Sequence, residues 1–311
     1  MDGDDILKNK MLLLFSILFI CALTSSCGFP GLQSNSENTI RIAAQSTTEG
    51  EVMAQVIKDL IEHDTNYRVT IINNLGSGNM TFSAIHNGDA DLSSVRYTGT
   101  DLATVMGKDY DRSKSSRKID QYVYDYFKAH HHMTYFPSYG FANTYTWIVA
   151  PQYAKKHHLE KVSDLKPLAK KMDVGIDDVW KIRKGDGYGA FTKLYGFSFG
   201  RVRIMQNGLF YQAVANKKVN AVLGYSTDGR IAGYRLKTLR DDKKFFPPYD
   251  CSVVANDSAL KKYPKLRHVL AKLNGKISLT TIQTLNYSVE NNLEEPEIVA
   301  EKFVKQHHYF E

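Results

Sequence analysis

Short apolar runs alternate with segments that have one apolar face along the first third of the chain. The apolar runs predict three strands, at 40–43, 69–72 and 92–95. A helix should follow the first strand, because Thr48-x-x-Glu51 has the form of a capping box. Its apolar side chains recur three or four residues apart: Val52, Val56, Ile57, Leu60 and Ile61. Strands that alternate with helices are typical of an α/β unit with a largely parallel sheet.

The same alternation continues to the end of the chain. Further strands are predicted at 144–150, near Val174, and at 201–205, 220–224 and 252–255. Further helices are predicted at 115–131, from the cap Ser163-Asp164, around Phe191, and at 209–216, 258–273, 277–291 and 296–307. Two α/β sets suit a chain of 311 residues, since single hydrophobic cores usually stop growing near ~250–300 residues.

The segment before the first strand has the pattern of an export signal. Residues 11–23 form an apolar stretch that is too short to span a bilayer and suits the core of a signal peptide, expected at 1–26. Cys27 follows in Leu23-Thr24-Ser25-Ser26-Cys27-Gly28, which resembles a bacterial lipobox. We therefore expect a lipid on Cys27 and a flexible tether at 27–37. The alternative is an ordinary secretory signal with an incidental cysteine.

Charge and cysteine content limit the classes of function. The formal net charge is +7, but Lys and Arg are scattered along the sequence, mostly among acidic residues. No basic run is interleaved with aromatic residues, so nucleic-acid binding is not expected, and a general attraction to anionic headgroups or cell wall is the safer inference. The three cysteines lack metal-type spacing. Cys251 lies in an apolar run and should be a buried free thiol.

Four tyrosines stand in polar, turn-prone segments beside short apolar runs, a setting that places each of them at the end of a strand. They lie in Tyr97-Thr98-Gly99-Thr100, predicted as a turn, and in Asn143-Thr144-Tyr145, Tyr225-Ser226-Thr227-Asp228 and Pro247-Pro248-Tyr249. With GFANTY at 140–145, these motifs resemble those of the substrate-binding lipoproteins of bacterial ABC importers for glycine betaine, carnitine and choline. The resemblance covers residues 38–311.

The resemblance implies a ligand site. A quaternary ammonium group has no N–H to donate, and aromatic faces suit its diffuse charge. The family's aromatic cage is matched by Tyr97, Tyr145, Tyr225 and Tyr249. Gln45 matches a polar contact to the ligand, and Asn143 is a further polar contact. An Asp at the position of Thr100 goes with choline preference in the family, so Thr100 favours glycine betaine and carnitine.

The resemblance also implies an α/β fold of two lobes, the class II periplasmic-binding-protein type, with a hinge of two crossing strands. Lobe one is expected at 38–144 and 250–311, and lobe two at 145–249. The lobes would close over the ligand. The protein would then dock as a monomer onto an ABC permease and its ATPase, anchored outside the cytoplasm on the cell membrane. No catalytic residue, metal or cofactor is implied.

Two features depart from the family's pattern. Arg96 stands before Tyr97 where an acidic residue is more familiar, so it must either point away from the site as the strand alternates or weaken choline binding. The basic stretch 112–118 also differs, and the sequence offers no function for it.

Other motifs suggest alternative functions. Residues 196–200 fit G-x-S-x-G, which would make Ser198 the nucleophile of a secreted hydrolase, but that motif needs a strand before the serine and a helix after it. The reverse order is predicted here. The histidines at 130–132 and 307–308 are predicted to be solvated helix ends rather than metal ligands. A sensor lipoprotein of the same fold, without transport, is a third possibility.

Overall fold

The computed structural model describes residues 38–183 and 185–309. Residues from Ile40 onward form one compact unit, to which the site described below belongs. The predicted signal peptide at 1–26, the tether at 27–37 and Cys27 lie outside the described residues. Within the described ranges, no helix is both long enough and apolar enough to cross a bilayer.

The first of two five-stranded sheets has the order β2-β1-β3-β10-β4. Strands β1 and β3 are parallel, whereas β10 is antiparallel to both β3 and β4. The strand bounds are β1 Thr39–Gln45, β2 Arg68–Leu75, β3 Leu92–Tyr97, β4 Met133–Tyr135 and β10 Cys251–Asn256.

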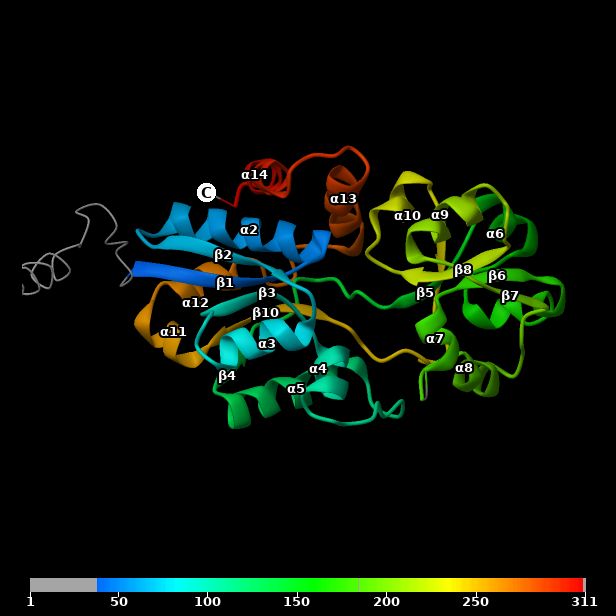
Figure 1. The fold of residues 1–311 in the computed structure, drawn as a ribbon, viewed down its shortest axis with the longest axis horizontal. Coiled ribbons are helices and arrows are strands. Elements are labelled where there is room, and N and C mark those ends of the chain that lie inside the picture. Colours follow the sequence, from blue (N-terminus) through cyan, green and yellow to red (C-terminus); the bar gives the residue numbers. More distant parts are fainter. Residues whose placement is uncertain (1–37, 184, 310–311) are drawn as a thin grey trace, which may run out of the picture. The chain divides into compact units, whose positions relative to one another are not determined.

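Helices cover both faces of this sheet (Figure 1). Neighbouring residues of β1 point to opposite faces, so Ile42 packs in the core under α2 while Ala43 packs in the core formed with α3 and α5. The helix bounds are α2 Thr48–Asp64, α3 Gly78–His86, α4 Thr98–Thr104, α5 Ser116–His131, α11 Asp257–Lys262, α12 Leu266–Ala271, α13 Leu279–Glu290 and α14 Pro296–Gln306.

The second sheet has the order β7-β6-β8-β5-β9, with β6, β7 and β8 parallel and β5 antiparallel to β8 and β9. Its larger core is aromatic and is built around Trp147, Trp180 and Phe191. The strand bounds are β5 Tyr145–Val149, β6 Asp173–Ile176, β7 Arg201–Ile204, β8 Ala221–Tyr225 and β9 Lys237–Leu239. The helix bounds are α6 Pro151–His157, η2 Val162–Leu165, η3 Ala169–Lys171, α7 Asp178–Ile182, α8 Tyr188–Tyr195, α9 Asn207–Ala215 and α10 Gly229–Gly233.

The chain passes between the sheets twice, and the two connections pair with each other. Ala142 and Asp250 form an antiparallel bridge, and the Asn143 N–H donates to the Tyr249 carbonyl at 3.1 Å. The α/β fold with two mixed sheets is as predicted, and this pairing corresponds to the two crossing strands expected of the hinge.

Several local predictions were wrong. The cap of α2 is Thr47, whose Oγ1 accepts from the Gly50 N–H at 3.1 Å, so the capping box was placed one residue too late. Residues 98–104 form helix α4 rather than a turn. The helix expected at 258–273 is broken, because Pro264 disfavours a helical conformation in the residue before it, and Tyr263 has φ −117° and ψ 79°.

Several short elements were not revealed by the sequence patterns. Ser163-Asp164 lies in the 3-10 turn η2 rather than opening an α-helix. Strands β4 and β9 span only three residues each, which is too short for an alternation to show. Helices α6, α7 and α10, of five to seven residues, were missed for the same reason.

Candidate ligand-binding site

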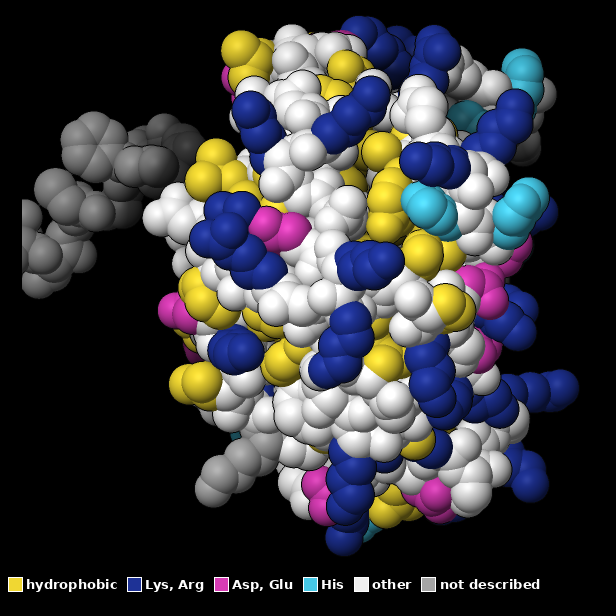
Figure 2. All heavy atoms as spheres, turned by 90° about the vertical axis from the view of Figure 1, so that its right-hand side faces the viewer, with side chains coloured by type: hydrophobic (Ala, Val, Ile, Leu, Met, Phe, Trp, Pro, Cys, Tyr) yellow, Lys and Arg dark blue, Asp and Glu magenta, His cyan; other side chains and the backbone are white. Residues whose placement is uncertain are grey.

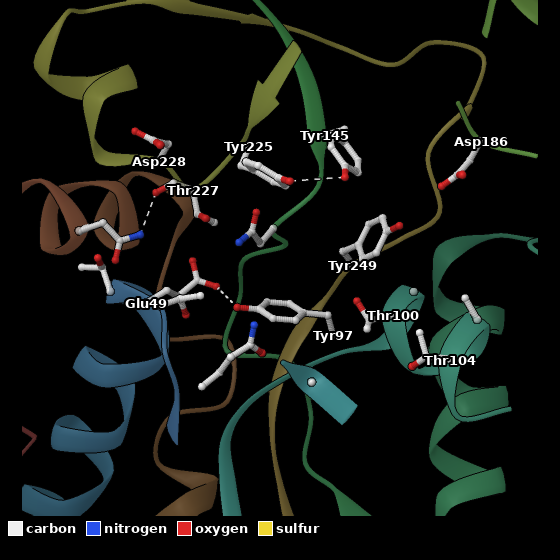
Figure 3. Close-up of a pocket in the computed structure, with 18 of the residues that line it drawn as sticks. Glu49, Tyr97, Thr100, Thr104, Tyr145, Asp186, Tyr225, Thr227, Asp228 and Tyr249 are labelled. Carbon is white, nitrogen blue, oxygen red and sulfur yellow. Dashed lines mark hydrogen bonds between the residues drawn. The ribbon is translucent and has the colours of Figure 1, made fainter. Parts of the chain in front are cut away.

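A cavity of about 720 Å³ is lined by residues of both sheets and their connections. All seven residues predicted to contact a ligand line it: Gln45, Tyr97, Thr100, Asn143, Tyr145, Tyr225 and Tyr249. Figure 3 shows the four tyrosine rings around the same space. Residues that lie up to 204 positions apart in the sequence therefore meet at one site, as the motifs predicted.

Strand ends position most of these side chains. Gln45 and Tyr97 are the last residues of the parallel strands β1 and β3, so both lie at the same edge of the first sheet. Tyr145 begins β5 and Tyr225 ends the antiparallel β8, and the two face each other in register. Their ring centroids are 5.0 Å apart.

Tyr249 is held by the helix that follows Tyr97. A Cβ on Gly99 would lie 2.4 Å from the Pro248 carbonyl oxygen and 2.9 Å from Cδ1 of Tyr249. Only glycine permits this close approach of α4 to the crossing segment. The Gly of the Tyr97–Thr100 motif is thus explained by packing against the fourth tyrosine.

Hydrogen bonds hold three of the tyrosines by their hydroxyl groups. Tyr97 donates to Oε1 of Glu49 at 2.5 Å, and Tyr225 donates to the Tyr145 hydroxyl at 3.4 Å. The guanidinium of Arg183 donates to the Tyr145 hydroxyl at 3.0 Å. Burial raises the pKa of Tyr97, Tyr225 and Tyr249, so the rings remain neutral phenols at physiological pH. These contacts fix the ring edges, which are the polar part of a tyrosine.

Glu49 is a site residue that sequence reasoning missed. It lies in the first turn of α2, is only 3% exposed, and lines the cavity. Burial raises the pKa of its carboxyl above the ordinary value, while the hydrogen bond from the Tyr97 hydroxyl lowers it. An acid in a first helical turn is ordinary by pattern, and only the fold shows that this one faces the cavity.

Arg183 and Asp186, in the connection between α7 and α8, were also missed. The Arg183 guanidinium lies 5.4 Å from the Tyr145 ring centroid and pairs with the Asp186 carboxylate at 3.4 Å. Among the described lining residues, Arg183 is the one Lys or Arg, beside four acids: Glu49, Asp186, Asp228 and Glu290. Asp228 is paired with Arg230 and Asp186 with Arg183, so the acidic excess comes from Glu49 and Glu290. This excess favours a cationic ligand, and the guanidinium offers a place for a carboxylate.

Helix α13 connects the two sheets at one side of the cavity. The Gln283 side chain donates to the Ser226 carbonyl at 2.7 Å, and the Asn286 side chain donates to the Thr227 carbonyl at 2.9 Å. A Cβ on Gly229 would lie 2.3 Å from the Tyr287 nitrogen, so α10 packs closely on α13. The α13 side of the cavity is therefore fixed by polar contacts as well as by packing.

Arg96 points away from the cavity, as strand alternation allowed. It is 2% exposed and forms an ion pair with Asp101. Its Nη1 also donates to the Gly78 carbonyl at 2.6 Å and to Thr81 Oγ1 at 2.9 Å. The positive charge of the guanidinium is therefore neutralised inside the core of the first sheet. It does not repel a cation in the cavity.

One residue of the basic stretch 112–118, Arg112, has a structural role. The Arg112 guanidinium lies 5.2 Å from the Phe245 ring centroid, and its Nε donates to the Phe245 carbonyl at 3.4 Å. Arg112 thus braces the segment that leads to Tyr249. Lys114 forms a surface ion pair with Asp111 at 3.7 Å and lies 5.9 Å from the Tyr122 ring centroid.

The alternative motifs do not assemble a catalytic or metal site. Ser198 follows α8 and precedes β7, the reverse of a nucleophile elbow, and its Oγ accepts from Lys170 Nζ at 2.9 Å. His131 packs against Phe82 and Phe127. In the described ranges no three His, Cys, Asp or Glu side chains are grouped to hold a metal ion. Cys251 is a buried free cysteine, as predicted.

Asp120 of α5 and Asp250, which follows Tyr249, form a carboxyl pair behind the cavity. Burial and the neighbouring Asp250 raise the pKa of Asp120 to about 7, and burial also raises the pKa of Asp250. Because the pKa of Asp120 is higher than the ~3.9 of an unfolded chain, the folded state holds more protons between these values. The pair should therefore reduce the free energy of unfolding as the pH rises from about 4 to about 7.

Replacing Asp120 with asparagine should remove this pH dependence. At pH ~8 we expect the Asp120→Asn variant to be more stable by on the order of 1 kcal/mol, a value reduced by partial solvent screening. At pH ~4, where the folded carboxyl is protonated and the unfolded one is about half protonated, little gain is expected. Urea unfolding at both pH values measures this, with exposed Asp109→Asn as the control. An equal effect of Asp120→Asn at the two pH values would contradict the assignment.

The fold and this cavity define a solute-binding protein of two sheets around a ligand site. Residues 38–306 match the family model described as the substrate-binding domain of an ABC-type glycine betaine transport system. The chain belongs to this family. It is an extracytoplasmic transport binding protein and not an enzyme.

Individual relatives agree with the family assignment. The chain is 46% identical, over 98% of its length and 99% of the relative's, to the carnitine transport binding protein OpuCC of Listeria monocytogenes serotype 1/2a. It is 27% identical to a glycine-betaine-binding protein of Pseudomonas aeruginosa, over 87% of this chain and 88% of that one. The crystal structure of a glycine betaine/carnitine/choline ABC transporter matches with a TM-score of 0.85 and 47% identity, covering 88% of this chain and all of that chain.

Proposed function

We propose that the cavity binds glycine betaine and carnitine, and choline less well, with Tyr97, Tyr145, Tyr225 and Tyr249 as an aromatic cage. The observation that carries this proposal is the convergence of the four rings on one cavity whose other charged groups are mostly acidic. Each desolvated ring contributes ~0.5–2 kcal/mol to binding a quaternary ammonium group. Four rings together supply ~2–8 kcal/mol, so contacts to the rest of the ligand must add to this to offset the entropic cost of association.

The far end of the ligand requires hydrogen-bond donors. Arg183 supplies a charge-assisted donor for a carboxylate, and the amides of Gln45 and Asn143 supply neutral ones. Thr100 lines the cavity where an Asp would add a negative charge. Because that charge would repel a carboxylate and attract choline, Thr100 favours the zwitterions glycine betaine and carnitine.

We propose that residues 38–144 with 250–311 form lobe one and residues 145–249 form lobe two, which close over the ligand about the paired crossing segments. The bridge between Ala142 and Asp250 supports this hinge. The loaded monomer would dock onto a membrane permease driven by an ATPase. Acylated Cys27 would anchor the protein to the outer face of the cell membrane.

Calorimetric titration of the chain from Asn38 onward with glycine betaine, carnitine and choline tests the proposed ligands. Saturable binding is expected for the two zwitterions, with weaker binding of choline. The absence of heat with all three, in a protein whose circular dichroism shows a native fold, would refute the proposed ligands.

Removing Arg183 should separate the zwitterions from choline. In the Arg183→Ala variant, the affinity for glycine betaine and carnitine should fall by ~10- to 100-fold, the effect of losing a charge-assisted hydrogen bond of ~1.5–3 kcal/mol. Choline carries no carboxylate, so its affinity should stay constant or rise. Lys181→Ala, an exposed position of α7, is the control and should bind all three as the wild type does. Equal losses for all three ligands would contradict this role.

A further inference from the structure

The positive charge of the protein is concentrated in one part of the fold. Residues 145–249, which include the second sheet, contain 20 Lys and Arg against 9 Asp and Glu, a net charge of +11. Residues 38–144 and 250–311 contain 18 basic and 20 acidic residues, a net charge of −2. Lys and Arg occur along the whole sequence, but the excess of basic over acidic residues falls within 145–249.

Exposure makes the difference larger. Among the described residues of 145–249, 15 Lys and Arg are exposed, whereas the exposed acids number two, Glu160 and Asp178. Glu160 already pairs with Lys237, and the half-buried Asp173 pairs with Arg203. The free surface charge of this region is almost entirely positive.

Sheet topology places many of these cations at one edge. Lys170 and Lys171 directly precede β6, Arg201 begins β7, and Lys217 and Lys218 precede β8. These three strands are parallel, so the listed positions lie at their amino-terminal ends. Lys155 and Lys156 lie on α6, which follows the end of the antiparallel β5 at the same edge, where Val149 pairs with Ala221. Tyr145 and Tyr225 lie at the opposite edge, in the ligand cavity.

We name this surface the distal basic face and define it by seven exposed residues: Lys155, Lys156, Lys170, Lys171, Arg201, Lys217 and Lys218. Figure 2 shows the corresponding side of the molecule, where Lys and Arg side chains are far more numerous than Asp and Glu. Within the described ranges, none of the seven forms an ion pair with an acidic side chain of the chain itself. Intramolecular pairing therefore does not account for them.

We propose that the distal basic face binds the anionic phospholipid headgroups of a membrane surface. Six of the seven residues are lysines, which are compact point charges and suit dispersed phosphates. Lysine is depleted in protein–protein interfaces, which favour an apolar and aromatic centre. The exposed Ile204 instead ends β7, and the exposed Ile182 ends α7, which follows β6, so both lie toward the opposite, carboxyl-terminal edge of the sheet. Each Lys or Arg near an anionic bilayer contributes ~1 kcal/mol, so the face would bind reversibly and in a salt-dependent way.

This inference is independent of which solute the cavity binds. The chain from Asn38 onward, which contains both sheets and their cores, is mixed with vesicles of phosphatidylcholine alone or with about 30% phosphatidylglycerol. Co-sedimentation is expected only with the anionic vesicles and should weaken when NaCl is raised from about 50 to about 300 mM, where screening is stronger.

Two variants with the same change in charge locate the contact. The distal variant carries Lys155→Gln, Lys156→Gln, Lys170→Gln and Lys171→Gln. The control variant carries four substitutions on α11, α12 and the turn between them: Lys261→Gln, Lys262→Gln, Lys265→Gln and Arg267→Gln, all exposed positions beside the first sheet. The distal variant should lose at least ~10-fold in partitioning to anionic vesicles, and the control should retain most of it. Both should bind glycine betaine as the wild type does.

Three outcomes would overturn the inference. Equal losses in the two variants would show that net charge alone drives association. Equal binding to neutral and anionic vesicles would show an apolar contact. Retention on an immobilised acidic polypeptide without binding to anionic vesicles would assign the face to an acidic protein partner. A failure of glycine betaine to bind would count against the cavity's proposed ligand and leave the vesicle result unaffected.

Discussion

Replacing Tyr249 with alanine is expected to lower the affinity for glycine betaine by ~10- to 100-fold. Tyr249 is the clearest of the four tyrosines to test, because among the described residues no side chain or backbone group hydrogen-bonds its hydroxyl, whereas Tyr97, Tyr145 and Tyr225 each take part in such a bond. Its substitution removes a ring face without leaving a buried polar partner. The loss combines a cation–π contact of up to ~2 kcal/mol with lost packing around the ligand.

Calorimetric titration of Tyr249→Ala and Tyr249→Phe measures this effect. Phenylalanine retains the aromatic face, so Tyr249→Phe should stay within about threefold of the wild-type affinity, a difference below ~0.7 kcal/mol. If the phenylalanine variant loses as much affinity as the alanine variant, the hydroxyl rather than the ring face is what the ligand needs, and the cage interpretation fails at this position.

Replacing Asp101 with alanine is expected to cause the largest loss of stability. Asp101 is fully buried and accepts hydrogen bonds from Arg96 and from the Tyr135 hydroxyl. Its removal leaves the Arg96 guanidinium in the core between α3 and α5 without a counter-charge, which typically costs ~3–5 kcal/mol. Urea unfolding followed by circular dichroism should report a decrease of that size in the free energy of unfolding.

The matched control is the surface pair of Arg41 and Asp91. Arg41 is 41% exposed, so Asp91→Ala should lower the free energy of unfolding by about 1 kcal/mol. The substitution also removes the acceptor of the Arg41 backbone N–H, which adds little to this cost. A cost for Asp101→Ala no greater than that of the control would mean that water reaches the Arg96 guanidinium and that the pair is not a core element.

The sequence predicts the central elements of the fold because buried apolar side chains recur at the spacing of a strand or a helix. Strands β1, β3, β8 and β10 were found as apolar runs, and α5 and α14 by helical spacing. The four tyrosines were singled out because the motifs that contain them resemble those of the substrate-binding family. Parallel topology then implied that Gln45 and Tyr97 would share one edge, and both line the cavity.

Other features of the site depend on contacts between residues far apart in the sequence, which a local sequence pattern does not predict. Glu49 has the sequence of an ordinary first-turn acid, and only the packing of α2 on β3, which ends at Tyr97, brings it to the Tyr97 hydroxyl. Arg183 lies in a connection whose course is set by the aromatic core around Trp180. The excess of basic residues over 145–249 can be counted in the sequence. What the sequence does not show is that lysines from separate connections meet at the amino-terminal edge of the second sheet.

A methylation series is the measurement that tests the central claim most directly. Glycine, N-methylglycine, N,N-dimethylglycine and glycine betaine share one carboxylate and differ only in the N–H groups that methyls replace. A cage of tyrosine faces predicts that affinity rises with each methyl group and is highest for glycine betaine, since the faces attract diffuse charge and accept no strong hydrogen bond. Equal or tighter binding of glycine or N-methylglycine would show that the cavity recognises N–H donors, and would contradict the assignment of the four tyrosines to a quaternary ammonium group.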